Sequence, residues 1–183
     1  MTDVVDLIMQ DHREFERMLD QLTEEPEKRA DVLPVFITLI TAHSRAEEAE
    51  VYPPAAEAGA AHDVEHSQEE HVEADELLAK LAATDPASAD FDEVLADVDE
   101  SVRHHLGEEE ETVLPKMREL ISATRLEELG DAFAAVRAEH LGERPADITK
   151  AELEQQAANA DVPRQRGMTK DELQQALREK ASS

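Results

Sequence analysis

Apolar side chains return every three or four positions through most of the chain, and this spacing lines one face of an α-helix. In residues 3–22 the stripe runs through Val5, Ile8, Phe15 and Leu19. Short stretches rich in proline, aspartate and serine separate one stripe from the next. We therefore predict helices over residues 3–22, 29–52, 63–83, from 91 onward and over 125–141.

The breaks between these stripes are short. Pro26 follows the end of the first helix, and Pro53-Pro54 is expected to stop the second, leaving residues 55–62 as a connection. Residues 84–90 form a predicted loop, and Pro115 is expected to kink or interrupt the fourth helix. Long amphipathic helices joined by short loops predict an all-α, up-down-up-down four-helix bundle with one additional helix.

The end of the chain contains a short internal repeat. Residues 148–153 read Ile-Thr-Lys-Ala-Glu-Leu, and residues 168–173 read Met-Thr-Lys-Asp-Glu-Leu. In each copy the threonine suits a helix N-cap, and the glutamate three positions later completes a capping box. The tail therefore predicts helix, extended loop and helix, so we divide the chain into a bundle over 1–144 and a small helical module over 145–183.

The amino-acid composition is typical of a helical protein and excludes functional sites that depend on cysteine. Aromatic residues make up 3% of the chain and there are only five glycines, while hydrophobic residues reach 40%. The absence of cysteine excludes disulfides, zinc–thiolate sites and iron–sulfur clusters. No window is long and apolar enough for a membrane span, and no targeting segment opens the sequence. We expect a soluble cytoplasmic protein with no membrane partner.

Charge is distributed unevenly along the chain. The formal net charge is -27, yet residues 145–183 hold six Lys/Arg and seven Asp/Glu, so nearly all the excess falls on residues 1–144. Such an acidic body argues against nucleic acid or anionic lipid as its partner.

The most specific pattern is a repeat that places a histidine four residues before a glutamate. His43 precedes Glu47, and His105 precedes Glu109, with a proline ten residues after each histidine. Positions i and i+4 lie one above the other on a helix, so each copy presents an imidazole beside a carboxylate.

Four histidines fall on the apolar faces of four different predicted helices. A single histidine on such a face usually has a structural role, but burying four imidazoles and two carboxylates costs several kcal/mol each unless they are paired or coordinated. A shared metal site offsets that cost for all six groups together. The predicted ligands are His12, His43, Glu47, His71, His105 and Glu109.

Helical register separates these candidates from their neighbours. His105 continues the buried stripe, whereas His104 lies about 100° around the helix. The same argument favours His71 over His66, so we place His104 and His66 outside the ligand set, as solvated or supporting residues. The other glutamates near the motifs are expected on a solvated face; they are Glu48, Glu108, Glu110 and Glu111.

Nitrogen and carboxylate oxygen together suit iron, manganese or zinc better than calcium or magnesium. Six protein ligands divided between two metal ions leave each ion with open positions for small molecules. The Glu-x-x-His pattern of ferritin-like sites is missing from this register.

The motif order His, His-x3-Glu, His, His-x3-Glu over roughly residues 3–120 resembles the hemerythrin-like, HHE cation-binding family. This resemblance implies a four-helix bundle around two iron ions joined by an oxo or hydroxo bridge. It implies that the six residues named above are the ligands and that Glu47 and Glu109 bridge the ions.

Two positions modify what the resemblance implies. Oxygen-carrying hemerythrins have two histidines four residues apart on the third helix, whereas Ser67 and Asp75 flank His71 at that spacing. We therefore do not expect a five-histidine oxygen carrier. Tyr52, the only tyrosine, either packs at a helix end or lines the metal pocket, where it could add a ligand.

The tail repeat looks like the Rho-N/SAP-like helix–loop–helix module, whose relatives bind nucleic acid. That resemblance offers Lys150, Arg164, Arg166 and Lys170 as phosphate contacts. A small stabilising or partner-docking appendage is the other interpretation, and the acidic body favours it.

Two functional hypotheses follow from the metal site. In the first, a di-iron protein handles oxidants such as H2O2, NO or O2, with catalase-like or nitric-oxide-peroxidase-like activity. In the second, the chain is a non-enzymatic module that binds iron or oxygen, or senses redox state. A purely structural acidic bundle would carry no metal.

Overall fold

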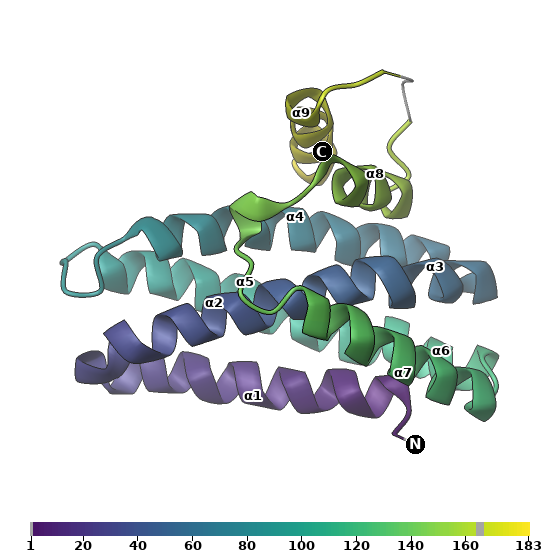
Figure 1. Cartoon of the computed structure of the whole chain (residues 1–183), viewed down its shortest axis with the longest axis horizontal. Helices are drawn as coiled ribbons and strands as arrows, with labels where there is room; N and C mark the ends of the chain where they lie inside the picture. Colours follow the sequence, from purple (N-terminus) through teal and green to yellow (C-terminus); the bar gives the residue numbers. More distant parts are fainter. Residues whose placement is uncertain (1, 164–166) are drawn as a thin grey trace.

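A computed structural model describes residues 2–163 and 167–183 of the chain, and within these ranges all regular structure is helical (Figure 1). The long elements are α1 (Val4–Glu24), α2 (Arg29–Ala46), α4 (Ala61–Ala83) and α5 (Phe91–Glu111). The shorter ones are α3 (Tyr52–Ala55), α6 (Val113–Leu120), α7 (Ala123–Glu139), α8 (Lys150–Asn159) and α9 (Lys170–Ala181).

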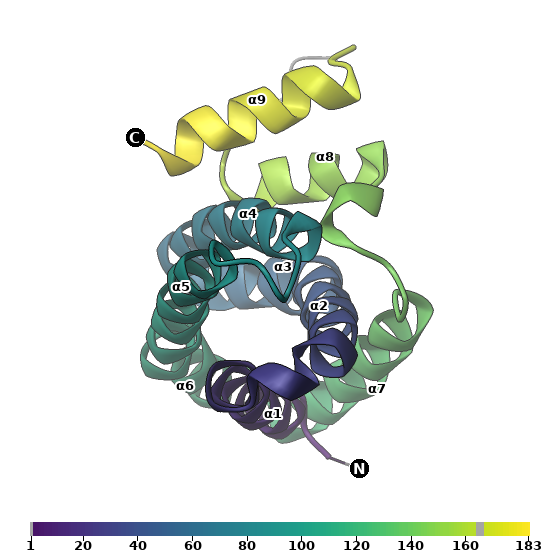
Figure 2. The ribbon, with the colours of Figure 1, turned by 90° about the vertical axis from the view of Figure 1, so that its left-hand side faces the viewer.

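The four long helices form a ring around a shared core, which confirms the predicted bundle. Seen along its axis, α1, α2, α4 and α5 enclose the centre, and α7 covers the outer side of α1 and α2 (Figure 2). One apolar cluster, which includes Phe15, Phe36 and Phe91, fills one end of the bundle. A second cluster, which includes Ile8 and Phe133, fills the other end. The six predicted metal ligands are buried between these two clusters.

The capping signals in the sequence are present in the structure. The Thr149 and Thr169 hydroxyls accept hydrogen bonds from the backbone N–H groups of Glu152 and Glu172, and each glutamate carboxylate accepts one in return. These reciprocal bonds satisfy amide groups that the first helical turn leaves free. The two helices predicted for the tail are therefore confirmed.

The predicted stop at Pro53-Pro54 is wrong, because the helix widens there instead of ending. Residues Glu47–Val51 form a π-helical turn, α3 follows, and a second π-helical turn covers Ala56–Ala60. Pro53 has no N–H and its ring clashes with the preceding turn of an α-helix. The wider turn, in which the Tyr52 N–H bonds to the Glu47 carbonyl, absorbs both problems. The chain instead breaks later, at Gly59, whose φ of 122° lies outside the helical region, so the expected connection over 55–62 is reduced to a kink there.

Pro115, by contrast, interrupts its helix as predicted. α5 ends at Glu111, Thr112 adopts φ -120° and ψ -72°, and α6 begins at Val113. The proline ring would clash with the carbonyl four residues earlier, at Glu111, so the chain breaks at this position. The two copies of the His-x3-Glu repeat therefore continue into different backbone shapes.

The two tail helices pack on the outer face of α4 and do not extend away from the bundle (Figure 2). Val72 of α4 joins a small apolar cluster with Ile148, Leu153, Leu173 and Leu177 of the tail. Ion pairs add to this contact, since Lys180 reaches Glu65 and Glu69 of α4.

Among the described residues, none of the helices combines the length and the apolar character that a membrane crossing requires.

Candidate metal centre

Six polar side chains meet inside the bundle, between the two apolar clusters. They come from α1, from α2 and the π-helical turn that follows it, from α4 and from α5, so every long helix contributes. Each has at most 6% of its surface exposed, although all six are titratable. They are the six residues that the sequence offers as ligands: His12, His43, Glu47, His71, His105 and Glu109.

Each of the four histidines turns its Nδ1 atom outward onto a carboxylate, at 2.9 to 3.1 Å. Carboxylates accept hydrogen bonds, so this contact places the ring proton on Nδ1 and leaves the Nε2 lone pair facing inward. An arrangement of carboxylate, histidine and open Nε2 is the usual support for a metal-ligating imidazole. The pairs are His12 with Glu110, His43 with Asp11, His71 with Glu48, and His105 with Glu70.

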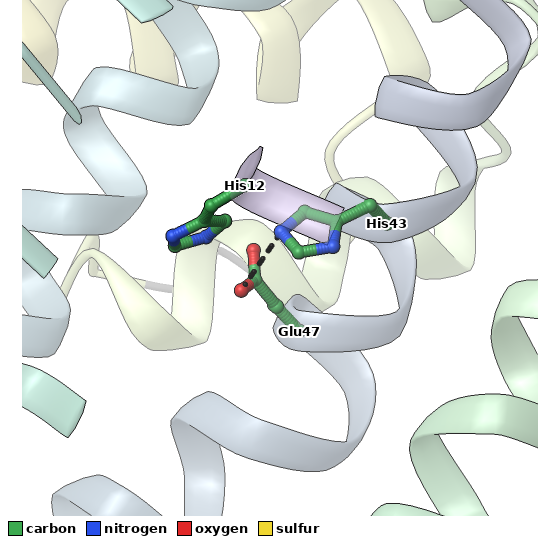
Figure 3. A group of neighbouring side chains, drawn as sticks. All are labelled: His12, His43 and Glu47. Carbon is green, nitrogen blue, oxygen red and sulfur yellow. Dashed lines mark ion pairs between the residues drawn. The ribbon is translucent and has the colours of Figure 1, made fainter. Parts of the chain in front are cut away.

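One half of the centre combines His12 and His43 with two carboxylates. The Nε2 atom of His43 lies 3.1 Å from an oxygen of Glu47, and that of His12 lies 3.4 Å from an oxygen of Glu109. Figure 3 shows both imidazoles turned toward the Glu47 carboxylate. Ligand atoms of His12, His43 and Glu47 all lie within 4.8 Å of one another, so these three residues could hold one metal ion.

The other half uses the same glutamate. The Nε2 atom of His71 lies 3.5 Å from the second oxygen of Glu47 and 2.9 Å from Nε2 of His105. Ligand atoms of Glu47, His71 and His105 again lie within 4.8 Å of one another. Glu47 thus belongs to both groups, as expected of a residue between two cations.

The inward atoms fit a cation because most of them have no hydrogen-bond partner. Nε2 of His12 and of His43, and both oxygens of Glu47 and Glu109, have no hydrogen-bond partner among the described residues. The Nε2 atoms of His71 and His105 lie 2.9 Å apart, and with the proton of each ring on Nδ1 they would face each other as two acceptors. Buried charged groups without partners are strongly destabilising, and metal coordination removes that penalty. The donor set of imidazole nitrogen and carboxylate oxygen suits first-row transition metals.

The electrostatics of the centre also favour positive charge. Burial alone would lower the pKa of His43, but the charge of Glu47 close to Nε2 and the contact of Nδ1 with Asp11 raise the pKa to about 9. Burial likewise opposes the charged form of His71, and its contacts with Glu47 and Glu48 raise its pKa to about 10. A metal ion competes with these protons, so its binding strengthens as pH rises.

This geometry agrees with comparisons to known proteins. The family model of the hemerythrin HHE cation-binding domain matches residues 3–117, well over half of the chain and all six inward residues. The chain belongs to this hemerythrin family. Its residues 3–117 are accordingly a metal-binding domain.

One curated relative from Nostoc sp. is named "DNA nickase" and is 24% identical over 133 residues. The match covers 72% of this chain but only 38% of that protein, so the chain spans well under half of the relative's length. No solved structure matches the chain.

Tyr52 lies in the hemerythrin centre. Its side chain is fully buried, and its hydroxyl is 3.1 Å from Nε2 of His71, to which it can donate a hydrogen bond. Burial, together with the charges of Glu109 and Glu47, raises the pKa of the phenol well above its usual value. The wide turn before Pro53 places this residue at the centre.

The expectation that Glu48 and Glu110 lie on a solvated face is wrong. Glu48 is 2% exposed, and the Glu110 carboxylate is mostly covered where it accepts from His12. Glu48 binds both His71 and the buried Arg45, whose guanidinium also pairs with Asp75. Burial alone would raise the pKa of Glu48, but Arg45 and His71 lower it to about 2, so it stays ionised.

The tail supplies part of the network around Glu48, which sequence reasoning missed. Gln156 of α8 is 2% exposed and donates to the Glu48 oxygen that also faces His71. Gln68 donates to the same oxygen, and Asn159 of α8 donates to the Glu48 carbonyl. Residues from beyond the matched family region therefore help to hold a predicted ligand. No local pattern in the tail marks Gln156 for this role.

His66 and His104 lie outside the ring of inward residues, on the surface beside it. The Nε2 atoms of His66 and His104 are 3.6 and 3.3 Å from one oxygen of Glu70. The other oxygen of Glu70 accepts from Nδ1 of His105. Both histidines thus contact the ligand set through one carboxylate.

The basic residues suggested for nucleic-acid contact are only partly described. Arg164 and Arg166 fall outside the described residues. Lys150 lies 3.9 Å from Glu154 on α8, and Lys170 starts α9 beside a hollow between the tail and α4.

Gln156→Ala tests whether the tail supports the hemerythrin centre. Removing a donor to a buried charged acceptor is expected to lower the free energy of unfolding by about 1.5–3 kcal/mol. Because Glu48 orients His71, metal affinity of the centre should fall about 10- to 100-fold, the usual effect of losing such a supporting contact. Urea denaturation and competition with a chelator measure the two effects. Gln175→Ala, at an exposed position of α9, should change neither.

Proposed function

We propose that this chain is a non-haem di-iron protein of the hemerythrin family that handles oxidants, namely peroxide, nitric oxide or dioxygen. The observation that carries the proposal is the orientation of four buried histidines, each held by a carboxylate at Nδ1 with Nε2 inward. The family is the reason for choosing iron, since the donor set alone would suit manganese or zinc as well.

The six predicted ligands would be divided between the two metal ions. The imidazoles of His12 and His43 would hold one ion and those of His71 and His105 the other, with Glu47 contributing to both. Glu109, next to His12, would complete the first half. Two iron ions held in this way supply Lewis acidity and one-electron chemistry to a small molecule. The outer carboxylates keep each ring in position and supply negative charge that balances the cations.

Reaction with oxidants is favoured over reversible oxygen carriage by what surrounds His71. The positions four residues before and after His71 hold Ser67, which is buried, and Asp75, which pairs with Arg45, so neither supplies a fifth histidine ligand. The missing ligand leaves an ion more open. Tyr52 lies beside that open side, with a hydroxyl able to donate to a bound small molecule or to His71.

The test adds H2O2 to the purified iron-containing protein and follows O2 with an oxygen electrode. We expect turnover that depends on iron and disappears in His43→Ala, and a Tyr52→Phe variant that keeps its iron but changes the turnover rate. In parallel, anaerobic addition of NO should change the visible absorption of the same protein. Absence of both turnover and an NO response would overturn oxidant handling. Slow bleaching without turnover would instead favour the sensing alternative.

A second candidate function is nucleic-acid binding by residues 145–183, through Lys150, Lys170 and the two arginines before Gly167. The tail repeat suggests it, and the relative named "DNA nickase" is a further reason to test it. Fluorescence anisotropy with labelled duplex DNA at low salt is the measurement. Deleting the tail would also remove Gln156, so the informative variant is Lys150→Gln/Lys170→Gln. Equal anisotropy for wild type and variant would remove this candidate.

A further inference from the structure

A second group of metal-ligating side chains lies at the surface, outside the buried centre. His66 on α4 and His104 on α5 both direct Nε2 toward the same oxygen of Glu70, at 3.6 and 3.3 Å. The two imidazoles are 52% and 62% exposed, whereas the Glu70 side chain is only 10% exposed. A buried carboxylate oxygen thus sits between two accessible nitrogen donors.

The Glu70 oxygen that faces this pair has no hydrogen-bond partner among the described residues. Its other oxygen accepts from His105, so the carboxylate is held in place and cannot easily turn away. A buried carboxylate oxygen without a partner is costly, and exposed histidine–carboxylate contacts at these distances compensate little of that cost. A cation bound between the three groups would satisfy the oxygen fully.

The surroundings suit a cation that comes from solvent. The three groups line an open hollow of about 430 Å³, whose walls also carry the carboxylates of Glu69, Glu73 and Glu100. Both histidine side chains are exposed enough to rotate about their bonds and bring Nε2 to a metal held by Glu70. Two nitrogens and one oxygen leave coordination positions for water, so such an ion would exchange readily.

The hollow lies on the side where the buried centre is nearest to solvent. His105 is 6% exposed, more than any other predicted ligand, and it contacts the hollow through Glu70. The other five ligands are at most 3% exposed. The Glu70 carboxylate therefore connects the surface pair with His105, the most exposed of the predicted ligands.

We infer that His66, His104 and Glu70 form a surface site for one divalent first-row metal ion, from which the buried centre is loaded. The surface site stands on its own geometry, whereas its loading role rests on the proposed di-iron function. In the described part of the chain the two histidines reach the inward ligands only through Glu70, so replacing them leaves every direct ligand contact in place.

The first test counts bound Co²⁺ by equilibrium dialysis, with His66→Ala/His104→Ala as the variant. The variant should bind one equivalent fewer than wild type. His62→Ala, an exposed histidine on the same helix, should bind as wild type does. The difference in Co²⁺ stoichiometry between wild type and the double variant does not depend on which metal the buried centre holds. The surface site can therefore be tested even if the di-iron proposal fails. Equal stoichiometry in wild type and the double variant would overturn the surface site.

A second measurement needs no variant and reads the same site in the intact protein. Small amounts of Mn²⁺ should broaden the imidazole proton resonances of His66 and His104 before that of His62. Uniform broadening of the three would contradict the site. For the loading role, stopped-flow absorption should show slower uptake of Fe²⁺ by the double variant but the same final iron content. Equal uptake rates would leave a surface site with no part in loading and so overturn that role.

Discussion

Replacing Glu47 with glutamine is expected to empty the buried centre. Among the described residues, Glu47 alone belongs to both ligand groups, so its loss affects both ions together. Glutamine keeps the size of the side chain but removes its negative charge. Its amide N–H groups would also donate to the Nε2 lone pairs that a metal ion needs. Iron bound per chain should fall from about two to well below one. Metal analysis of the purified variant measures this.

The matched control is Glu50→Gln, in the same π-helical turn but partly exposed and outside the inward set. It changes the charge by the same amount and should leave the iron content at the wild-type level. Both variants should show unchanged helical circular dichroism. If Glu47→Gln retained two irons, Glu47 would not be shared between them.

Arg45→Met is expected to cost about 3–5 kcal/mol of unfolding free energy, because it removes the buried cation that pairs with the buried Glu48 and the mostly covered Asp75. Arg45 is 2% exposed and binds Glu48 at 3.1 Å and Asp75 at 2.7 Å. Methionine fills similar space but cannot balance their charge. Urea denaturation of wild type and variant, both stripped of metal, gives the difference in free energy directly.

Arg17→Met is the control for that loss. Arg17 also contacts an acidic residue, Glu14, but its side chain is 56% exposed. Exposed pairs of this kind contribute less than about 1 kcal/mol, so the control should unfold near the wild-type midpoint. Two variants with equal losses would show that burial of the Arg45 network contributes nothing to stability.

Much of the bundle and its inward residues could be predicted from the sequence because helical periodicity fixes which side chains share a face. His12, His43, His71 and His105 each lie on an apolar stripe, and that placement alone brings them together once four helices pack. The prolines show the limit of such reasoning. Pro115 breaks its helix, whereas Pro53 is absorbed by a wider turn, and the local sequence does not distinguish the two outcomes.

The outer shell of the centre could not be predicted, because it depends on contacts between distant segments. Glu48 follows Glu47 directly and its acidic neighbours predict a solvent-facing position, yet tertiary packing buries it against Arg45 and His71. Gln156 lies 108 residues away and reaches the same carboxylate only because α8 packs on α4. A helical pattern describes one element at a time and carries no information about such pairings.

The central claim is that the six inward side chains bind two metal ions. Its most direct test is the metal content of protein purified without added metal, by plasma mass spectrometry, beside His43→Ala and His105→Ala. We expect about two irons per chain in the wild type and a clear loss in each variant. A wild type with little bound metal, or variants that keep the wild-type content, would contradict the account.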